Sequence, residues 1–137
     1  MEVEILVGIL LAIQSYWDIK EQKISTCFSV VGGALGFLLS MYMGRGYLDV
    51  CMALVPGISF LAISWLSKEC VGYGDGILIC ALGFFYTWNA LCVLLFAALL
   101  FSAGVALVLF AVFKKSGNDT IPFVPFLLLG WFVHMCI

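Results

Sequence analysis

Long apolar stretches separated by short polar breaks run along the whole chain of 137 residues. A helix that crosses a bilayer needs roughly 20 apolar residues, with a lower limit near 17. The pattern predicts an all-α fold, a polytopic bundle of about six transmembrane helices. The fourth segment is short, and Trp88-Asn89 is the expected turn between it and the fifth. The predicted segments are residues 3–17, 27–44, 48–66, 76–88, 90–113 and 121–137.

The composition favours a membrane protein over a soluble one. Hydrophobic residues make up 65% of the chain and charged residues 10%, whereas soluble domains are roughly half apolar and a quarter charged. The apolar segments leave no room for a soluble module, so we expect a single transmembrane domain at 1–137, surrounded by a lipid bilayer. The net charge is only −2 and there is no long basic patch, which argues against a nucleic-acid partner.

The first apolar segment is expected to be a retained helix rather than a signal peptide. It carries Glu2 and Glu4 in place of a basic region, and no small-residue cleavage site precedes Asp18.

The cysteines are scattered and form no CxxC pair. Most lie inside apolar runs, where a free cysteine behaves as a small hydrophobic residue. The spacing supports neither a disulfide framework nor a zinc site, so no metal is expected. The cysteines are Cys27, Cys51, Cys70, Cys80, Cys92 and Cys136.

The charges in the polar breaks predict the orientation of the helices. With six spans, the first, third and fifth breaks lie on one side of the membrane. The other two breaks carry one cation, Arg45. Because cytoplasmic loops are enriched in Lys and Arg, we expect the lysine-bearing breaks to face the cytoplasm and both termini to lie outside. The lysines are Lys20, Lys23, Lys68, Lys114 and Lys115.

Two acids on the predicted cytoplasmic side are candidates for function. Ionisable groups at membrane depth are costly and suggest function by default. Asp18, taken alone, is equally well explained as an interfacial charge that ends the first helix. Asp75 is harder to explain in this way, because Gly72, Gly74 and Gly76 surround it. Glycine permits a positive φ and a close approach of the backbone, and a helix cap needs one glycine at most.

Two carboxylates that meet at such a site indicate a definite chemistry. Like charges a few ångströms apart do not both ionise easily, so the pair shares one proton. The ionised member takes a proton from water, and the protonated member donates to the scissile carbonyl. The pattern therefore predicts peptide hydrolysis by general acid–base catalysis without a covalent intermediate. The proton belongs to the pair, so individual roles stay unassigned.

The remaining polar residues have simpler explanations. Glu4 is expected at an exposed terminus, and Asp49 on the outer side, away from the proposed site. His134 stands alone near the outer end of the last segment, and we expect no catalytic role for it. Gly32 and Gly36 form a GxxxG pattern that suits close helix packing, either within one chain or between chains. The oligomeric state therefore stays open.

Two stretches resemble the motifs of type IV prepilin peptidases, a family of GxGD-type intramembrane aspartyl proteases. "GYGDGIL" is similar to the GxGD motif and carries over to Gly72, Gly74 and catalytic Asp75. "DIKEQKIS" is similar to the first catalytic segment, in which Ile-Pro follows an aspartate by six residues. It carries over to catalytic Asp18 and to Ile24.

A third stretch, "IPFVPFLLLG", resembles the Pro-Phe-x-Pro-Phe segment that opens the last helix of the family. The matching residues, which we expect to shape the site, are Pro122, Phe123, Pro125 and Phe126. GxGD alone is a weak motif, but the three stretches together, in this order and spacing, are fairly specific.

The resemblance implies a helical membrane bundle with its aspartate pair at the cytoplasmic face of the cell membrane. It implies an endopeptidase that removes the short basic leader of prepilin-like precursors, where the leader meets a long apolar helix. No cofactor is implied. Larger members carry an amino-terminal domain with paired cysteines and also methylate the new amino terminus. This chain is similar to the compact branch that serves Flp/Tad-type pili and archaeal preflagellins, so we expect no N-methyltransferase activity.

The sequence departs from the family pattern at two positions. Ser25 replaces the usual proline after Ile24, and Ile77 replaces a lysine that is common two residues after the GxGD aspartate. The second change removes a cation near the pair, which keeps open an intact fold without activity. A non-enzymatic alternative also stays open, because a small transporter or assembly subunit would use such acids to bind protons or a cation.

Overall fold

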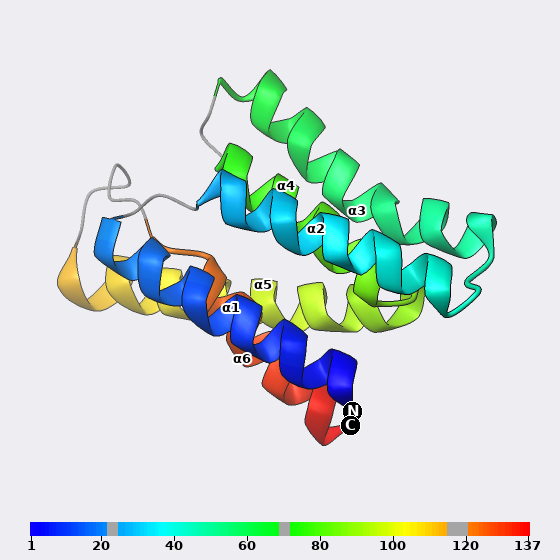
Figure 1. Ribbon diagram of the computed structural model, residues 1–137. Helices are drawn as coiled ribbons and strands as arrows, with labels where there is room; N and C mark the ends of the chain where they lie inside the picture. Colours follow the sequence, from blue (N-terminus) through cyan, green and yellow to red (C-terminus); the bar gives the residue numbers. More distant parts are fainter. Residues whose placement is uncertain (22–24, 69–71, 115–120) are drawn as a thin grey trace.

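The computed structural model describes residues 1–21, 25–68, 72–114 and 121–137. Within these ranges the protein is all-α, as predicted, and contains six helices (Figure 1). They are α1 (Glu2–Glu21), α2 (Thr26–Tyr42), α3 (Tyr47–Leu66), α4 (Tyr73–Phe85), α5 (Trp88–Phe113) and α6 (Val124–Cys136).

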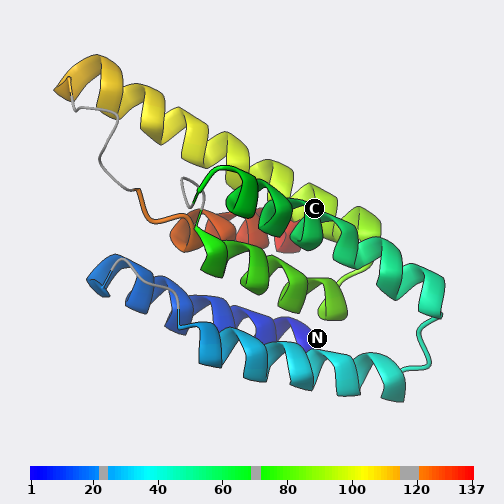
Figure 2. The same ribbon diagram turned by 90° about the horizontal axis from the view of Figure 1, so that it is seen from above.

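The helices form two layers of three. The α4 layer contains α2, α3 and α4, with α4 packed closely against both of its neighbours. The α6 layer contains α1, α5 and α6, and α6 packs against both α5 and α1. Contacts between the two layers are fewer. The α4 layer lies above the α6 layer in Figure 1, and the two layers overlap when seen from above in Figure 2. Asp18 belongs to the α6 layer and Asp75 to the α4 layer.

Several predicted boundaries were wrong by three or four residues. Helix α1 continues to Glu21, so Asp18 lies within the helix and does not end it. Helix α4 begins at Tyr73, three residues before the predicted start. The turn after α4 falls before Trp88, which begins α5, so the expected Trp88-Asn89 turn was also wrong. Hydropathy marks where apolar residues end, whereas a helix continues through polar residues that suit its last turn, as Lys20 does.

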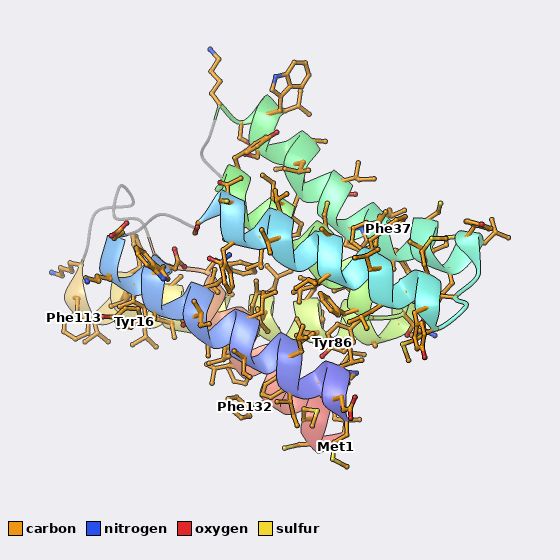
Figure 3. The ribbon with its side chains drawn as sticks, in the orientation of Figure 1. Met1, Tyr16, Phe37, Tyr86, Phe113 and Phe132 are labelled. Atoms are coloured by element: carbon orange, nitrogen blue, oxygen red, sulfur yellow. The ribbon has the colours of Figure 1, made fainter. Side chains whose placement is uncertain are left out.

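Two of the six helices, α3 and α5, are long and apolar enough to cross a membrane. Most of each helix is exposed, unlike the core helix of a soluble protein. Helices α2, α4 and α6 are apolar but shorter. Large apolar side chains such as Phe113 and Phe132 point outward (Figure 3). These features agree with a membrane protein, while six spans stay a prediction.

Glycines allow α4 to lie unusually close to its neighbours. A Cβ atom added at Gly83 would lie 2.6 Å from the carbonyl oxygen of Ala53 in α3. One added at Gly57 in α3 would lie 2.7 Å from the amide nitrogen of Cys80. Gly36 of α2 likewise faces α4, since an added Cβ would lie 2.9 Å from Cβ of Phe84. Small residues at helix contacts are a common packing device in membranes, and here they serve contacts within one chain.

A polar cluster joins the helices at the end of the molecule that carries both termini (Figure 1). Glu4 is half-buried and accepts hydrogen bonds from the Tyr86 hydroxyl and, at 3.3 Å, from Trp131 Nε1. The expectation of an exposed Glu4 was therefore wrong. Tyr86 also packs edge-on against His134, with ring centroids 5.3 Å apart, so His134 is not alone. Burial and the Glu4 carboxylate raise the pKa of Tyr86, which keeps its hydroxyl protonated as a donor.

At the same end of the molecule, the Arg45 side chain caps the carboxyl-terminal end of α4. Its guanidinium donates to the carbonyl oxygens of Phe84 and Tyr86, each at 2.9 Å. The last carbonyls of a helix have no partner within the helix, so these bonds supply the missing donors. Arg45 also pairs with Asp49 at 2.9 Å, which agrees with the prediction that Asp49 lies away from the aspartate site.

The close packing of α4 predicts that Gly83→Ala lowers stability. The added methyl group would meet the Ala53 backbone, so α3 and α4 must separate, at a cost of about 1–3 kcal/mol. The measurement is thermal unfolding in detergent micelles. Gly104→Ala in α5 is the matched control, because nothing lies within 4 Å of a Cβ there. Alanine is better than glycine in a helix by about 1 kcal/mol, so this control should not unfold earlier. Equal melting temperatures for the two variants would contradict the packing account.

Candidate active site

Asp18 is the last member of the stripe that α1 turns toward the interior. Its side chain is 6% exposed, although the residues on both sides of it are exposed. Residues spaced three or four apart lie on one face of a helix, so this spacing places Asp18 on the same face as the buried apolar residues of α1. The buried residues of α1 are Val7, Leu10, Leu11, Gln14, Ser15 and Asp18.

The amino terminus of α6 holds the Asp18 carboxylate. The amide nitrogen of Val124 donates to Asp18 Oδ2 at 3.1 Å, and the Phe123 amide also acts on this group. The first amides of a helix have no partner within the helix and attract negative charge. Pro122 and Pro125 carry no N–H, which leaves the two amides between them as the donors at this helix end.

The aromatic residues of the same segment fix its position. Phe123 stacks on Phe60 of α3, with ring centroids 6.3 Å apart and planes inclined by 27°. Phe126 is buried in the hydrophobic core. The Pro-Phe-x-Pro-Phe segment therefore connects α6 to the other layer and presents its free amides to Asp18.

Asp75 lies in the first turn of α4, just after the N-cap residue Gly72. It is partly buried. Its Oδ1 atom is buried and accepts no hydrogen bond. A Cβ atom at Gly72 would lie 2.8 Å from Asp75 Oδ2, so glycine at this position leaves the carboxylate its space. Asp75 is therefore not the N-cap residue of α4, and its Oδ1 serves no backbone amide.

The neighbouring glycines work through close approach and not through unusual dihedrals. Gly72 has a φ of −58°, and Gly74 and Gly76 lie within α4. Among the described residues the only glycine with a positive φ is Gly44, so of the two properties that glycine offers, a positive φ is not used around Asp75. Gly76 is buried against α3, where an added Cβ would lie 3.1 Å from the Leu61 amide nitrogen. Close backbone packing is therefore the reason for glycine at 76.

The structure brings Asp18 and Asp75 together across the boundary between the two layers. The charge of Asp18 acts on Asp75, and Asp75 Oδ1 stays without a donor. The two carboxyls differ in their partners, because Asp18 is held by a helix terminus and Asp75 by no hydrogen bond at Oδ1. Such a pair can share one proton and act as acid and base together.

An open pocket of about 360 Å³ lies beside the first turn of α4. It is lined by Ser64, Trp65, Lys68 and Tyr73, at the end of α3 and the start of α4. Lys68 therefore places a cation close to the GxGD segment, where Ile77, partly buried on α4, supplies none. The loss of a lysine at position 77 does not leave this end of the bundle without positive charge.

The remaining predicted site position, Ile24, lies outside the described residues. Ser25 next to it is described and is the N-cap residue of α2. Among the described residues, no three His, Cys, Asp or Glu side chains are grouped so that they could hold a metal ion.

Gln14 is a residue of this site that the sequence analysis missed. It is completely buried one turn before Asp18, on the same face of α1. Its Nε2 donates to Ser29 Oγ at 2.7 Å and to the carbonyl oxygen of Ser25 at 3.2 Å. The available signal was a polar side chain four residues before Asp18 within an apolar run, because that spacing places both on one face.

Comparisons with known proteins show the family of this chain. Residues 5–107 match the type IV leader peptidase family, a stretch that contains both Asp18 and Asp75. The chain is 32% identical to the leader peptidase HopD of Escherichia coli over 137 residues, covering 94% of this chain and 88% of that relative. No solved structure matches the chain significantly. The family and the two long apolar helices indicate a protease in a membrane. The chain belongs to the type IV leader peptidase family.

Proposed function

We propose that this protein is an intramembrane aspartyl endopeptidase that removes the short basic leader from type IV prepilin-like precursors. Asp18 and Asp75 are its catalytic acids. Gly72, Gly74 and Gly76 form the backbone that brings Asp75 to the site. The substrate is a precursor in which a basic leader is followed by a long apolar helix, and the reaction needs no cofactor.

One observation carries the proposal. Asp18 and Asp75 come from different layers of the bundle, yet the charge of one acts on the other. Buried charges without a partner are costly, and a fold without a use for both acids would gain stability by replacing one of them. The helix terminus that holds Asp18 and the glycines beside Asp75 support a site built for two carboxyls.

The proposed topology has six spans, both termini outside and the aspartate pair at the cytoplasmic face, with residues 1–137 acting as one domain. The lysine distribution supports this orientation. A cytoplasmic site suits the substrate, because the charged leader stays in water while the apolar helix stays in the membrane.

The proposed reaction uses water directly. The ionised carboxylate takes a proton from water as the water oxygen bonds to the scissile carbonyl carbon. The protonated carboxyl gives its proton to the carbonyl oxygen, which produces a neutral diol. Collapse of the diol breaks the carbon–nitrogen bond. The leaving amine takes a proton from the protonated carboxyl, and the ionised carboxylate takes the proton of one diol hydroxyl, so the pair again holds one proton. No covalent enzyme intermediate forms.

Co-expression with prepilin-like reporters tests the catalytic pair. Each reporter carries a lysine-containing leader, a glycine at the junction and an apolar helix, and leader loss is read by intact mass. Asp18→Asn and Asp75→Asn should each reduce cleavage by at least about 100-fold, because each removes one partner of the acid–base pair. Asp49→Asn is the matched control, since this carboxylate pairs with Arg45 at the far end.

Normal cleavage by both aspartate variants would rule out the proposed dyad. Proton flux in liposomes that needs both acids, in a wild-type protein that cleaves no reporter, would support the transporter instead.

We predict that the protein alone does not methylate its product. The purified protein, incubated with a cleaved reporter and S-adenosylmethionine, should leave the reporter mass unchanged. A product heavier by one methyl group would overturn the assignment to a peptidase-only branch.

The two aspartates should respond oppositely to replacement by leucine. Asp18→Leu leaves the buried Val124 amide without its acceptor, which should lower stability by about 1–3 kcal/mol. Asp75→Leu removes a buried oxygen that accepts no hydrogen bond, so stability should hold or rise. Thermal unfolding in detergent compares the two, and Asp18→Asn, which keeps an acceptor oxygen, is the control. A larger loss in Asp75→Leu than in Asp18→Leu would contradict this geometry.

A further inference from the structure

Helix α3 contacts the elements that hold both aspartates. It packs closely against α4, the helix that carries Asp75. The same helix reaches the α6 layer through Phe60, whose ring stacks on Phe123. One helix therefore contacts the supports of both acids, although the acids belong to different layers.

The contact of α3 with α4 lies directly beside Asp75. A Cβ atom added at Gly76, the next residue, would lie 3.1 Å from the amide nitrogen of Leu61 and 2.8 Å from its side chain. Two helices that approach this closely have no side chain between them that could adapt to a shift. The backbone that carries Asp75 is therefore held at a fixed place relative to Leu61.

The contact of α3 with the α6 layer lies directly beside the amide that holds Asp18. Phe60 precedes Leu61 in α3, and Phe123 precedes Val124, whose amide donates to Asp18 Oδ2 at 3.1 Å. Both phenylalanine rings are partly buried and pack against the hydrophobic core. The stack therefore holds the start of α6 in place, and with it the carboxylate of Asp18.

These contacts form a continuous path from one acid to the other. Each step of the path is either a bond between neighbouring residues or a direct contact. The hydrogen bonds of Gln14 also join the layers, but they reach α2 and not the helix that carries Asp75. In order, the path runs through Asp75, Gly76, Leu61, Phe60, Phe123, Val124 and Asp18.

We propose that Phe60 is a positioning residue that sets the separation of the two aspartates by holding the start of α6 against α3. Stacked aromatic rings attract each other beyond the area that they bury, so the pair resists displacement. Like charges repel, and carboxylates that nothing holds together move apart. The stack opposes this movement at a boundary where the layers have few other contacts.

This inference rests on the proposed function and deepens it, because two carboxyls that share one proton need a fixed separation. Misplacement of reacting groups by about 1 Å can cost about 100-fold in rate. Phe60 acts through Phe123 and Leu61 and does not touch the reacting atoms. Its loss should therefore lower kcat, while KM changes little.

The other titratable groups described at this end of the molecule are exposed. Among the residues described, α6 contributes none at this end. Because water screens exposed charges, a change at Phe60 alters the titration through the buried pair. The exposed groups are Lys20 and Glu21 of α1, Cys27 of α2, Lys68 after α3, Tyr73 of α4 and Lys114 after α5.

Infrared titration of the purified full chain in detergent tests the positioning without any substrate. The carboxyl band is recorded against pH, and the steps that belong to the pair are identified by their change in Asp18→Asn and in Asp75→Asn. In Phe60→Leu the upper step should move to lower pH, by about half a unit per ångström of added separation. The reason is that an ionised partner farther away opposes the second ionisation less.

The kcat for a cleavable reporter should fall about 10- to 100-fold in Phe60→Leu, with KM within about twofold of the wild type. Phe60→Tyr keeps the ring and should titrate as the wild type does. Phe37→Leu is the matched control, because Phe37 packs edge-on against Phe84 near the other end of α4, with ring centroids 5.6 Å apart. It should leave both the titration and kcat unchanged.

Phe123→Leu should produce the same shift as Phe60→Leu. The double variant should shift no further than either single variant, since both changes break one stack. An additive double shift, an unchanged or upward step in Phe60→Leu, or an equal shift in Phe37→Leu would overturn the role of Phe60. Failure of the peptidase proposal would appear separately, as normal cleavage by the aspartate variants.

Discussion

The close contact of α4 with the backbones of its neighbours is the constraint on which the rest of the structure depends. Helix α4 has only 13 residues, and glycines at 57, 76 and 83 let it lie against α3 without intervening side chains. Backbone contact fixes the depth of a helix more strictly than long, adaptable side chains would. Because Asp75 lies in the first turn of α4, its depth is fixed by the same contacts. Arg45 completes the arrangement by satisfying the carbonyls at the other end of the helix.

The second carboxylate is positioned by different means. Asp18 belongs to the α6 layer and is held by the free amides that two prolines leave at the start of α6. The aspartate pair therefore spans the boundary between the two layers, where helix contacts are fewest. A small movement of one layer past the other changes the separation of the carboxyls without disturbing the packing inside either layer. The hydrogen bonds of Gln14 to Ser25 and Ser29 connect the α6 layer to α2 and limit such movement.

The sequence predicted the parts of this fold that depend on local pattern. The six apolar runs correspond to six helices, and the alternation of polar breaks correctly predicted that Asp18 and Asp75 share one end. It did not predict partners that only the packed molecule brings together. The buried position of Glu4 depends on Tyr86 and Trp131, far away in the chain. The glycines around Asp75 allowed either a positive φ or a close approach of the backbone, because the sequence does not show which backbone lies beside them. Gln14 was missed because one amide in an apolar run has no meaning until its serine partners are known.

Satisfied and unsatisfied buried polar groups lie at opposite ends of the bundle. At the end with the termini, the side chains of Glu4, Tyr86, Trp131 and Arg45 all have partners, with His134 Nδ1 as the exception. At the aspartate end, Gln14 Oε1 and Asp75 Oδ1 are buried and have no donor among the described residues. Selection for stability alone would replace Asp75 by an apolar residue of similar volume, since its Oδ1 has no donor to lose. Real proteins keep such locally unfavourable groups where function needs them, and the surrounding packing compensates for their cost. The glycine contacts of α4 supply this packing beside the aspartate site, so the same short helix carries close backbone contacts and an unsatisfied acid.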